Sequence, residues 1–410
     1  MTFHTGETLR PLNPIEEIFY LQERASSIAP SFLLQIEGTK SEVEWKHAIK
    51  QVQNVHPLLS TKITKALGKR PVFTKTDDEI EIEFCKWNQE FDVKAELSKS
   101  FERVFWSSNG PLLHLKIFSG LNKTFIIGHG CHTAFDAMGY MILIDDMLSF
   151  AGKHNYKKHP YEFQPESQVY KKLNLTLEHE YTSKKLEESD LTQGLNRTLT
   201  LPVHIYFGSL TEYELKSLIQ QCRSRNTTLH GLLVSAFATT GYKRFKEWQL
   251  RPPVFTTPAN VRPIVGLPDI PGNLIYNVIT PVMDLDKGDV WSTALQVNKD
   301  VHSGVQFESA LAAHQGAKET VSKEMSPKEV TKITDYLCGD MMVSNYGPQK
   351  IVQHDYGDLK LSGVRMSSVI DVPKVDIMTF NKESVITLAT RKPEEGWLEE
   401  AVNVLRNQIK

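Results

Sequence analysis

The sequence predicts a mixed α/β (α+β) protein in which helices and strands interleave through both halves of the chain. Three observations predict this class. Short apolar runs with two-residue alternation, typical of strands, occur among longer runs whose apolar residues recur at helical spacing. Residues 154–196 form a polar division between two such mixtures. The composition, 40% hydrophobic and 23% charged with a net charge of −2 over 410 residues, is that of a folded chain.

The first half begins with a proline-broken entry and a helix over residues 15–22. An apolar run over 32–38, closed by glycine, predicts a strand. Ser41 then stands three residues before Glu44, the spacing of a capping box, so a helix begins here and ends near His56-Pro57. We assign its buried side to Val43, Trp45, Ile49 and Val52. Further strands are predicted over residues 72–73, 80–84, 112–118 and 125–128.

The second half repeats the mixture after the polar segment. A second capping box, Thr211 with Glu214, opens a helix that runs through Cys222, and Thr228 caps the next helix. That helix covers residues 229–245, and strands follow over 252–263, with a proline-rich exit, and 272–279. We therefore divide the chain into an N-terminal half over 1–165, a polar connecting segment over 166–198 and a C-terminal half over 199–410.

Composition and spacing exclude several functional classes. A net charge near zero gives no general reason to expect nucleic acid or an anionic membrane as a partner. The longest strongly apolar run, Met138–Ile144, is far shorter than the roughly 20 residues of a membrane helix. The first residues lack the basic and apolar regions of a secretory signal. Four widely separated cysteines without a CxxC pair fit a reducing compartment, so we expect a cytoplasmic enzyme or binding protein.

One stretch, Ile127–Gly139, gathers groups that can do chemistry. Two histidines, a cysteine and an aspartate lie where an apolar strand ends and an apolar helix over residues 137–150 begins, and α/β proteins place sites at such junctions. His132 is the candidate general base, because a neutral imidazole is well matched to removing a proton near neutral pH. Asp136, four residues on, would hold the geometry of the loop.

The same residues have structural explanations. Asp136 is also suited to cap the helix that follows, and His132 to be an ordinary half-buried histidine. The His-x-x-x-Asp spacing is weak by itself, because His354 and Asp358 repeat it in a polar turn with no apolar helix after it. The surrounding sequence must therefore carry the functional interpretation.

Other chemistries fit this stretch less well. A metal is disfavoured because His129 and Cys131 point to one side of an extended segment and His132 to the other. No distant cluster of residues obviously supplies further ligands. Cys131 has apolar or neutral neighbours, which disfavour a nucleophilic thiolate. Gly128-x-Gly130 lacks the third glycine of a dinucleotide fingerprint.

The segment His132-Thr-Ala-Phe-Asp136 resembles the HHxxxDG signature of the condensation-domain and acyltransferase superfamily. This group includes chloramphenicol acetyltransferase, phthiocerol dimycocerosyl transferases, alcohol acyltransferases and plant HxxxD enzymes. Flanking segments resemble the family in the same order along the chain: Gly38 with the helix after it, His56-Pro-Leu-Leu59, Gly110–Leu115, Thr257–Pro263, Gly272–Val278 and the loop Val343–Gly347. A chance His-x-x-x-Asp would not bring these flanking matches, so they favour His132 as a functional residue.

The sequence departs from the signature at two positions. Cys131 stands in place of the first histidine, which many acyltransferase branches tolerate. Ala137 stands in place of the glycine after the aspartate, and a left-handed backbone there would cost an alanine on the order of 1 kcal/mol. This second departure favours the alternative function, a catalytically silent protein that binds an acyl carrier or an acyl group.

The resemblance implies two chloramphenicol-acetyltransferase-like halves that form a V-shaped pseudo-dimer with a central tunnel. It implies an acyltransferase that moves an acyl group from a thioester to a hydroxyl or amine acceptor, with ester formation favoured. His132 would deprotonate the acceptor, and Asp136 would pair with Arg262 to tie the loop to the second half. Candidate lining residues of the site are Cys131, Gly139 and Asn345.

The implied partners are small molecules. The donor would be acyl-CoA or a phosphopantetheine-linked acyl group, used as a substrate, and we expect no metal and no tightly bound cofactor. The chain carries no Asp-Ser-Leu attachment motif, so an acyl carrier protein would be a separate partner. We expect a monomer without a nucleic-acid partner, acting in secondary-metabolite or lipid biosynthesis. The basic cluster Lys243-Arg244-x-Lys246 is a candidate phosphate contact, although such clusters are usually only solvated. A thioester hydrolase on the same fold is a third candidate function.

Overall fold

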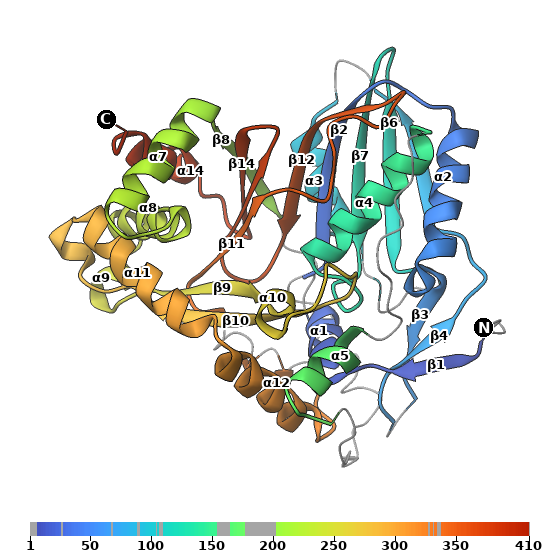
Figure 1. Cartoon of the computed structure of the whole chain (residues 1–410), viewed down its shortest axis with the longest axis horizontal. Helices are drawn as coiled ribbons and strands as arrows, with labels where there is room; N and C mark the ends of the chain where they lie inside the picture. The colour runs from blue at the N-terminus through green and yellow to red at the C-terminus, as the bar shows by residue number, and fades with distance from the viewer. Residues whose placement is uncertain are drawn as a thin grey trace.

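The structure, a computed structural model, describes residues 6–25, 28–66, 69–87, 91–103, 105, 110–153, 165–176, 202–326, 329–330, 332–333 and 338–409. Its elements form two halves that lie side by side, each built on one large sheet (Figure 1). The predicted mixed α/β class with two halves is confirmed. No described helix combines the length and the apolar character that a membrane crossing needs.

The bounds of the elements are as follows. The helices are α1 Pro14–Ala25, α2 Glu42–Val55, α3 Val93–Ser100, α4 Ala137–Ala151, α5 Pro165–Lys172, α7 Glu212–Ser224, α8 Leu229–Arg244, α9 Lys246–Leu250, α10 Val261–Val265, α11 Val290–Gly304, α12 Phe307–Val321 and α14 Trp397–Arg406, with short 3₁₀ turns η1 Pro57–Ser60 and η2 Leu285–Lys287. The strands are β1 Thr8–Pro11, β2 Pro30–Glu37, β3 Thr61–Thr64, β4 Val72–Lys75, β5 Glu81–Lys86, β6 Leu113–Ser119, β7 Lys123–Gly130, β8 His204–Leu210, β9 Val254–Asn260, β10 Ile275–Pro281, β11 Met341–Pro348, β12 Lys360–Ser368, β13 Lys374–Phe380 and β14 Glu383–Thr390.

A five-stranded sheet in the order β12-β2-β7-β6-β5 forms the N-terminal half. Strands β5 and β6 are parallel, and the other neighbours are antiparallel. Helices α2 and α4 lie on this sheet (Figure 1), where Trp45 and Ile144 join Leu34 and Ile126 in one buried core. A smaller sheet, β1-β4-β3, stands beside it. Because β7 is paired on both edges, its last residue, Gly130, is a fixed starting point for the loop that follows.

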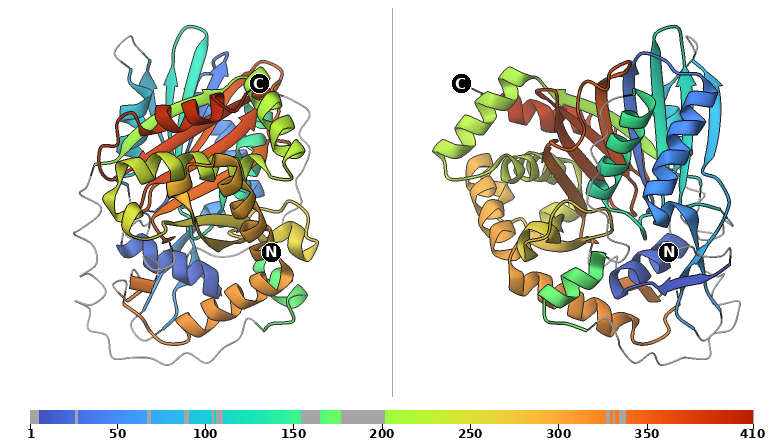
Figure 2. Two further views of the ribbon diagram at one scale, coloured as in Figure 1. Left: turned by 90° about the vertical axis from the view of Figure 1, so that its left-hand side faces the viewer. Right: turned by 45° about the vertical axis from the view of Figure 1, so that its right-hand side comes forward.

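A six-stranded sheet in the order β10-β9-β11-β13-β14-β8 forms the C-terminal half. Strand β11 runs parallel to both β9 and β13. Helices α7, α8 and α14 gather on one side of this sheet (Figures 1 and 2). Their core contains Trp397, which meets Phe237 and Trp248 edge to face at centroid distances of 5.8 and 6.0 Å. Edge-to-face packing of this kind contributes beyond the area that is buried.

Strand β12 crosses from the C-terminal half into the sheet of the N-terminal half. It follows β11 and precedes β13 along the chain, yet it pairs with β2, where Ser367 stands opposite Ser31. The sheet of the N-terminal half therefore contains one strand from the C-terminal part of the chain. Of the predicted connecting segment, the first part forms α5 with buried Val169, and residues 177–201 lie outside the described part of the chain.

Local signals located most of the predicted helices. The capping boxes of Ser41 and Thr211 are both formed, and they open α2 and α7. Val43, however, is 76% exposed, so its assignment to the buried side of α2 is wrong. The buried positions run through 45, 48, 49 and 52, and residue 43 lies outside that stripe.

Two further predictions need correction. The proline-rich exit of the strand over 252–263 is not extended: β9 ends at Asn260, whose side chain caps the short helix α10. The segment Val343–Gly347, expected as a loop, lies within β11 and pairs with β13. At α10 a local cap, in which Asn260 Oδ1 accepts from Arg262 N–H, ends the strand early. At β11 the pairing with β13, a strand farther along the chain, decides the conformation.

Candidate active site

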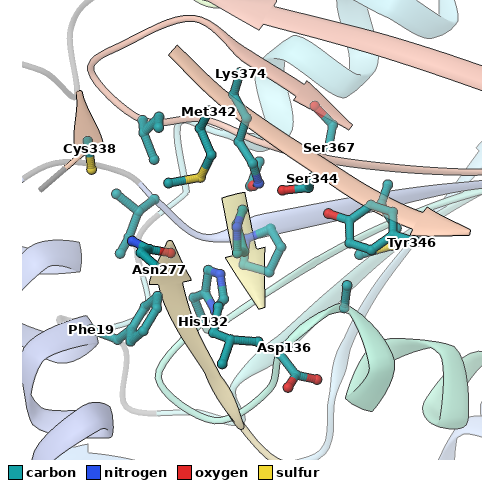
Figure 3. A pocket seen from close by; sticks show the side chains of 18 of the residues that line it. Phe19, His132, Asp136, Asn277, Cys338, Met342, Ser344, Tyr346, Ser367 and Lys374 are labelled. Carbon is teal, nitrogen blue, oxygen red and sulfur yellow. The ribbon is translucent and has the colours of Figure 1, made fainter. Parts of the chain in front are cut away.

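His132 follows β7 and lies half-buried on the wall of a cavity between the two halves (Figure 3). Its ring packs against Phe19 of α1, with a centroid distance of 4.4 Å. Burial lowers the pKa of His132 to about 4, the positive charge of Lys374 adds to this lowering, and the negative charge of Asp136 opposes it. At neutral pH the imidazole is therefore uncharged and able to accept a proton.

The backbone of this loop, residues 131–136, is bonded at both ends. Cys131 N–H donates to the carbonyl oxygen of Leu112 at 3.0 Å, which continues the pairing of β7 with its neighbour. The Asn273 side-chain amide donates to the carbonyl oxygen of His132 at 2.8 Å. Further along, Asp136 N–H donates to the carbonyl oxygen of Gly272 at 3.0 Å. Segments from both halves thus fix the backbone that carries the imidazole.

Asp136 and Arg262 form a buried ion pair across the two halves. Arg262 Nη1 donates to Asp136 Oδ2 at 2.7 Å and Nη2 donates to Oδ1 at 3.2 Å, and neither side chain is more than 2% exposed. The carboxylate also accepts from the backbone N–H of Gly139, which caps α4, and from that of Leu274. It points away from His132 (Figure 3). These hydrogen bonds satisfy both charges, as a buried pair requires.

Glu23, on α1, binds the other side of the loop. Its carboxylate accepts from His132 N–H at 2.6 Å, from Thr133 Oγ1 at 3.2 Å and from Cys131 Sγ at 3.1 Å. Burial raises the pKa of Glu23 to about 7, and these hydrogen bonds oppose the rise. Burial and the neighbouring Glu23 both raise the pKa of the Cys131 thiol, which disfavours a thiolate nucleophile.

The other candidate lining residues have different roles. Cys131 is buried beside Glu23 and does not line the cavity. Gly139 lies in the first turn of α4, where an added Cβ would come within 3.3 Å of the backbone of Gly272. Asn345 does line the cavity, and its side chain accepts from the backbone N–H of Gly347 at 3.0 Å. Ala137 begins α4 without a positive φ, so it bears no left-handed strain.

The nearby histidine and cysteine do not converge with His132 on one point. His129 Nε2 donates to the carbonyl oxygen of Arg103 at 3.1 Å, and its Nδ1 accepts from Ser31 Oγ at 2.7 Å. Burial lowers the pKa of His129 to about 3. Among the described residues, the carboxylates and imidazole that lie close enough for a metal are instead at one edge of the N-terminal sheet: Glu81, Glu83 and His114.

The basic cluster at the end of α8 is engaged elsewhere. Arg244 Nη2 donates to Glu400 Oε1 at 3.0 Å and to the carbonyl oxygen of Glu395 at 2.9 Å. Neither Lys243 nor Lys246 lines the cavities described here. This cluster therefore lies outside the described walls of the candidate site.

Two cavities adjoin at the site. The cavity beside His132 measures about 240 Å³, and a second, of about 910 Å³, lies between α1, β10 and α12. They share the lining residues Phe19, Gln22, Ile275, Asn277 and Cys338. The larger cavity has mostly apolar or small lining side chains, whereas the smaller one also carries Ser344, Ser367 and Lys374. Figure 3 shows these polar side chains across the smaller cavity from His132.

Solved structures resemble this protein over nearly the whole chain. A trichothecene 15-O-acetyltransferase from Fusarium sporotrichioides matches with a TM-score of 0.69 and 11% identity, covering 98% of this chain and 95% of that one. The condensation domain of the monacolin K polyketide synthase matches at 0.66 and 12%, over 98% of both chains. F. graminearum TRI101, complexed with coenzyme A and deoxynivalenol, matches at 0.61 and 12%, over 96% of both chains. The chain has the condensation-domain and acetyltransferase fold. No protein-family model and no curated protein sequence matches it.

Within this condensation-domain and acetyltransferase fold, two charged side chains of the site, Glu23 and Lys374, are not indicated by any local pattern in the sequence. Glu23 lies in a helix whose glutamates all look like exposed charges, and no local spacing ties it to residues 131–133. Lys374 begins β13, a strand that no local pattern indicated. Glu23 and Lys374 could have been found by looking for charged residues at positions on the buried side of their helix or strand, because a buried charge needs a specific reason.

Proposed function

We propose that this protein is an acyltransferase that moves an acyl group from a thioester to a hydroxyl or amine acceptor, with His132 as the general base. The observation that carries the proposal is an uncharged imidazole, with its pKa lowered to about 4, on the wall of a cavity between the two halves. The fold supports it, because structures with this fold include a 15-O-acetyltransferase and a complex with coenzyme A.

The reaction that fits this geometry is base-assisted attack on a carbonyl carbon. The acceptor O–H or N–H gives its proton to the imidazole as its oxygen or nitrogen bonds to the thioester carbon, and the carbonyl electrons move to oxygen. The tetrahedral oxyanion then collapses, the carbon–sulfur bond breaks, and the leaving thiolate takes the proton from the imidazolium. The products are an ester or amide and a free thiol.

The other candidate residues of the site have supporting roles in this proposal. Asp136 and Arg262 hold the loop in place through their ion pair at 2.7 Å and do not touch the substrate. Asn345 lines the cavity near the reacting groups. Cys131 is buried behind the loop, and Gly139 allows the close approach of Gly272 to the first turn of α4. The donor is acyl-CoA or an acyl group on a separate carrier protein. We favour a hydroxyl acceptor, in keeping with the O-acetyltransferase of the same fold.

The wider setting follows from the same proposal. We propose a monomeric, cytoplasmic enzyme of secondary-metabolite or lipid biosynthesis. The large apolar cavity supports substrates with a hydrocarbon part, because burying apolar substrate surface against an apolar wall lowers the free energy of binding. The names of the similar structures, which concern trichothecenes and monacolin K, support a biosynthetic setting.

The experiment measures free-thiol release from a panel of acyl-CoAs, with and without mixed alcohols and amines. Release that depends on an acceptor, together with an ester or amide detected by mass spectrometry, is the expected result. Release that is independent of the acceptor indicates a thioester hydrolase. Saturable binding of an acylated carrier protein, with no thiol release from any donor, indicates the catalytically silent alternative. The structure gives that alternative no support at Ala137, because the φ of this residue is not positive.

A further inference from the structure

Lys374 is a buried cation on the cavity wall that faces His132. It starts β13, its side chain is 6% exposed, and among the described residues that line this cavity it is the one lysine or arginine. In Figure 3 its side chain runs from β13 toward the part of the cavity where His132 lies. Its positive charge also contributes to lowering the pKa of His132.

The ammonium group is held in place by fixed partners. Lys374 Nζ lies 3.1 Å from Asp376 Oδ1 and donates to Ser368 Oγ. Asp376 in turn accepts from Tyr346 Oη at 2.5 Å and from Ser368 N–H at 3.2 Å, so the carboxylate is anchored as well. An ammonium has three N–H donors, and these two partners leave the third for a group in the cavity.

The charges of the residues on this cavity wall indicate which substrate group accepts a hydrogen bond from the third N–H of Lys374. Asp376 already balances Lys374, Asp136 is balanced by Arg262, and Asp371 in the same lining has the positive charge of Arg391 near it. A substrate that carries a full negative charge would enter without a compensating positive charge, which is costly in a buried site. An oxyanion formed inside the cavity is different, because it arises together with a protonated His132 and leaves the total charge unchanged.

We propose that Lys374 is a catalytic residue that donates a hydrogen bond to the thioester carbonyl oxygen as that oxygen becomes an oxyanion. This inference rests on the proposed acyl transfer. As the acceptor attacks, its proton passes to His132 and the carbonyl π electrons pass to the oxygen, which the ammonium then binds. When the carbon–sulfur bond breaks, the carbonyl re-forms, the thiolate leaves with the proton of His132, and Lys374 remains an ammonium throughout.

Ser367 supplies a second observation at the same wall. Its side chain is 2% exposed, it lines the cavity, and its hydroxyl has no hydrogen-bond partner among the described atoms. A buried hydroxyl without a partner costs free energy, unless a ligand completes its hydrogen bonding. Lys374 and Ser367 therefore place two hydrogen-bond donors on the same wall, where they can bind an oxygen of the substrate.

The test replaces the buried ion pair by neutral side chains, Lys374→Met with Asp376→Asn, so that no unpaired charge is left behind. The matched control is Lys65→Met with Glu324→Gln, which removes another buried pair, 3.1 Å long, whose residues line neither cavity. We expect kcat to fall about 10²–10³-fold in the first variant, as for loss of one oxyanion donor, with KM within a few-fold of the original. The control should keep its kcat.

The pH profile provides a readout that a merely structural role would not move. The charged or titratable groups of the described cavity lining are Lys374, Asp136, Asp371, Tyr346 and Cys338. Glu23 and Cys131 lie behind the loop, and Asp376 is paired with Lys374. The double variant removes both charges of the pair, and Lys374 has the larger effect of the two on the pKa of His132. The pKa of His132 should therefore rise from about 4, and the acid limb of kcat/KM should move to higher pH. Unchanged kcat and an unchanged acid limb would overturn the inference while transfer by the original protein continues. Absence of transfer by the original protein would instead remove the proposed function, and this inference with it.

Discussion

The Asp136 carboxylate is held by groups from both halves of the molecule. It accepts from the Arg262 guanidinium, from the first turn of its own helix through Gly139, and from Leu274 N–H ahead of β10. Removing its charge would leave Arg262 buried without a counter-ion. Desolvation of a charge is far more costly than loss of a single hydrogen bond, so this residue matters for folding as much as for the geometry of the site.

Replacing Asp136 by Asn should lower stability and activity together. Breaking a buried ion pair typically costs about 3–5 kcal/mol, which urea denaturation of the purified variant will measure. The matched control is Asp358→Asn, which alters the second His-x-x-x-Asp of the chain. Asp358 is 57% exposed, and its partner Lys40 also lies 3.9 Å from Glu44, so a much smaller change is expected there. An Asp136→Asn protein with full stability and full activity would contradict the proposed tie.

Glu23→Gln should weaken the loop and change how stability depends on pH. The pKa of Glu23 is raised to about 7 in the folded protein from an ordinary 4.5, so the folded state retains a proton that the unfolded state releases between these values. This group therefore makes the folded state less stable as pH rises from 4.5 to 7. Gln does not titrate, so the stability of the original protein relative to the variant should decline across that window. Melting temperatures measured at several pH values test this, and a constant difference would contradict it.

Residues whose partners are close in sequence could be predicted, and those with distant partners could not. His132 and Asp136 stand out because a short spacing sits between a strand and a helix. Arg262 was identified only through the resemblance to a family. Glu23 and Lys374 reach the site through the packing of α1 and β13, and no neighbouring residue in the sequence reveals that packing.

At the scale of elements, local start signals located some helices and missed others. Helices α2 and α7 begin at capping boxes, and α4 begins at Asp136, all of which depend on neighbouring residues. Helices α3 and α11 also begin at side-chain caps, Asp92 and Asp289, and neither helix was predicted. Strands β11 to β14 were not located, because their conformation is fixed by pairing with distant strands in two different sheets. β-propensity depends strongly on such context, which a single sequence does not display.

The start of α4 explains why glycine is required at one position and not at another. A Cβ on Gly139 would lie 3.3 Å from the backbone N and O of Gly272, so one of the two segments would have to shift. Gly139→Ala should therefore lower stability by about 1–3 kcal/mol and reduce activity, because the shift moves the loop. Ala137→Gly is the control, and its effect should stay below about 1 kcal/mol with activity retained. Thermal denaturation and thiol release measure both. A marked gain of activity in Ala137→Gly would revive the silent interpretation of the natural sequence.

At the scale of the whole molecule, the site exists only because the two halves are joined. Strand β12 enters the sheet of the N-terminal half, and the Asp136–Arg262 pair and the Asn273 amide bind the loop from the C-terminal half. The cavity beside His132 is lined by residues from both halves, such as Phe19 and Lys374. Chain length and composition predicted two halves, but the crossing strand and the cavity volumes depend on packing that composition does not encode.

The most direct test of this account is thiol release by His132→Ala at neutral pH with a donor and acceptor that the original protein uses. His354→Ala is the matched control, because it removes the histidine of the other His-x-x-x-Asp, which lies outside both cavities and bonds the carbonyl oxygen of Leu361. Loss of a general base is expected to lower kcat about 10²–10⁴-fold in His132→Ala, and His354→Ala should keep its rate. Equal rates for His132→Ala and the original protein would contradict the assignment of His132 as the base.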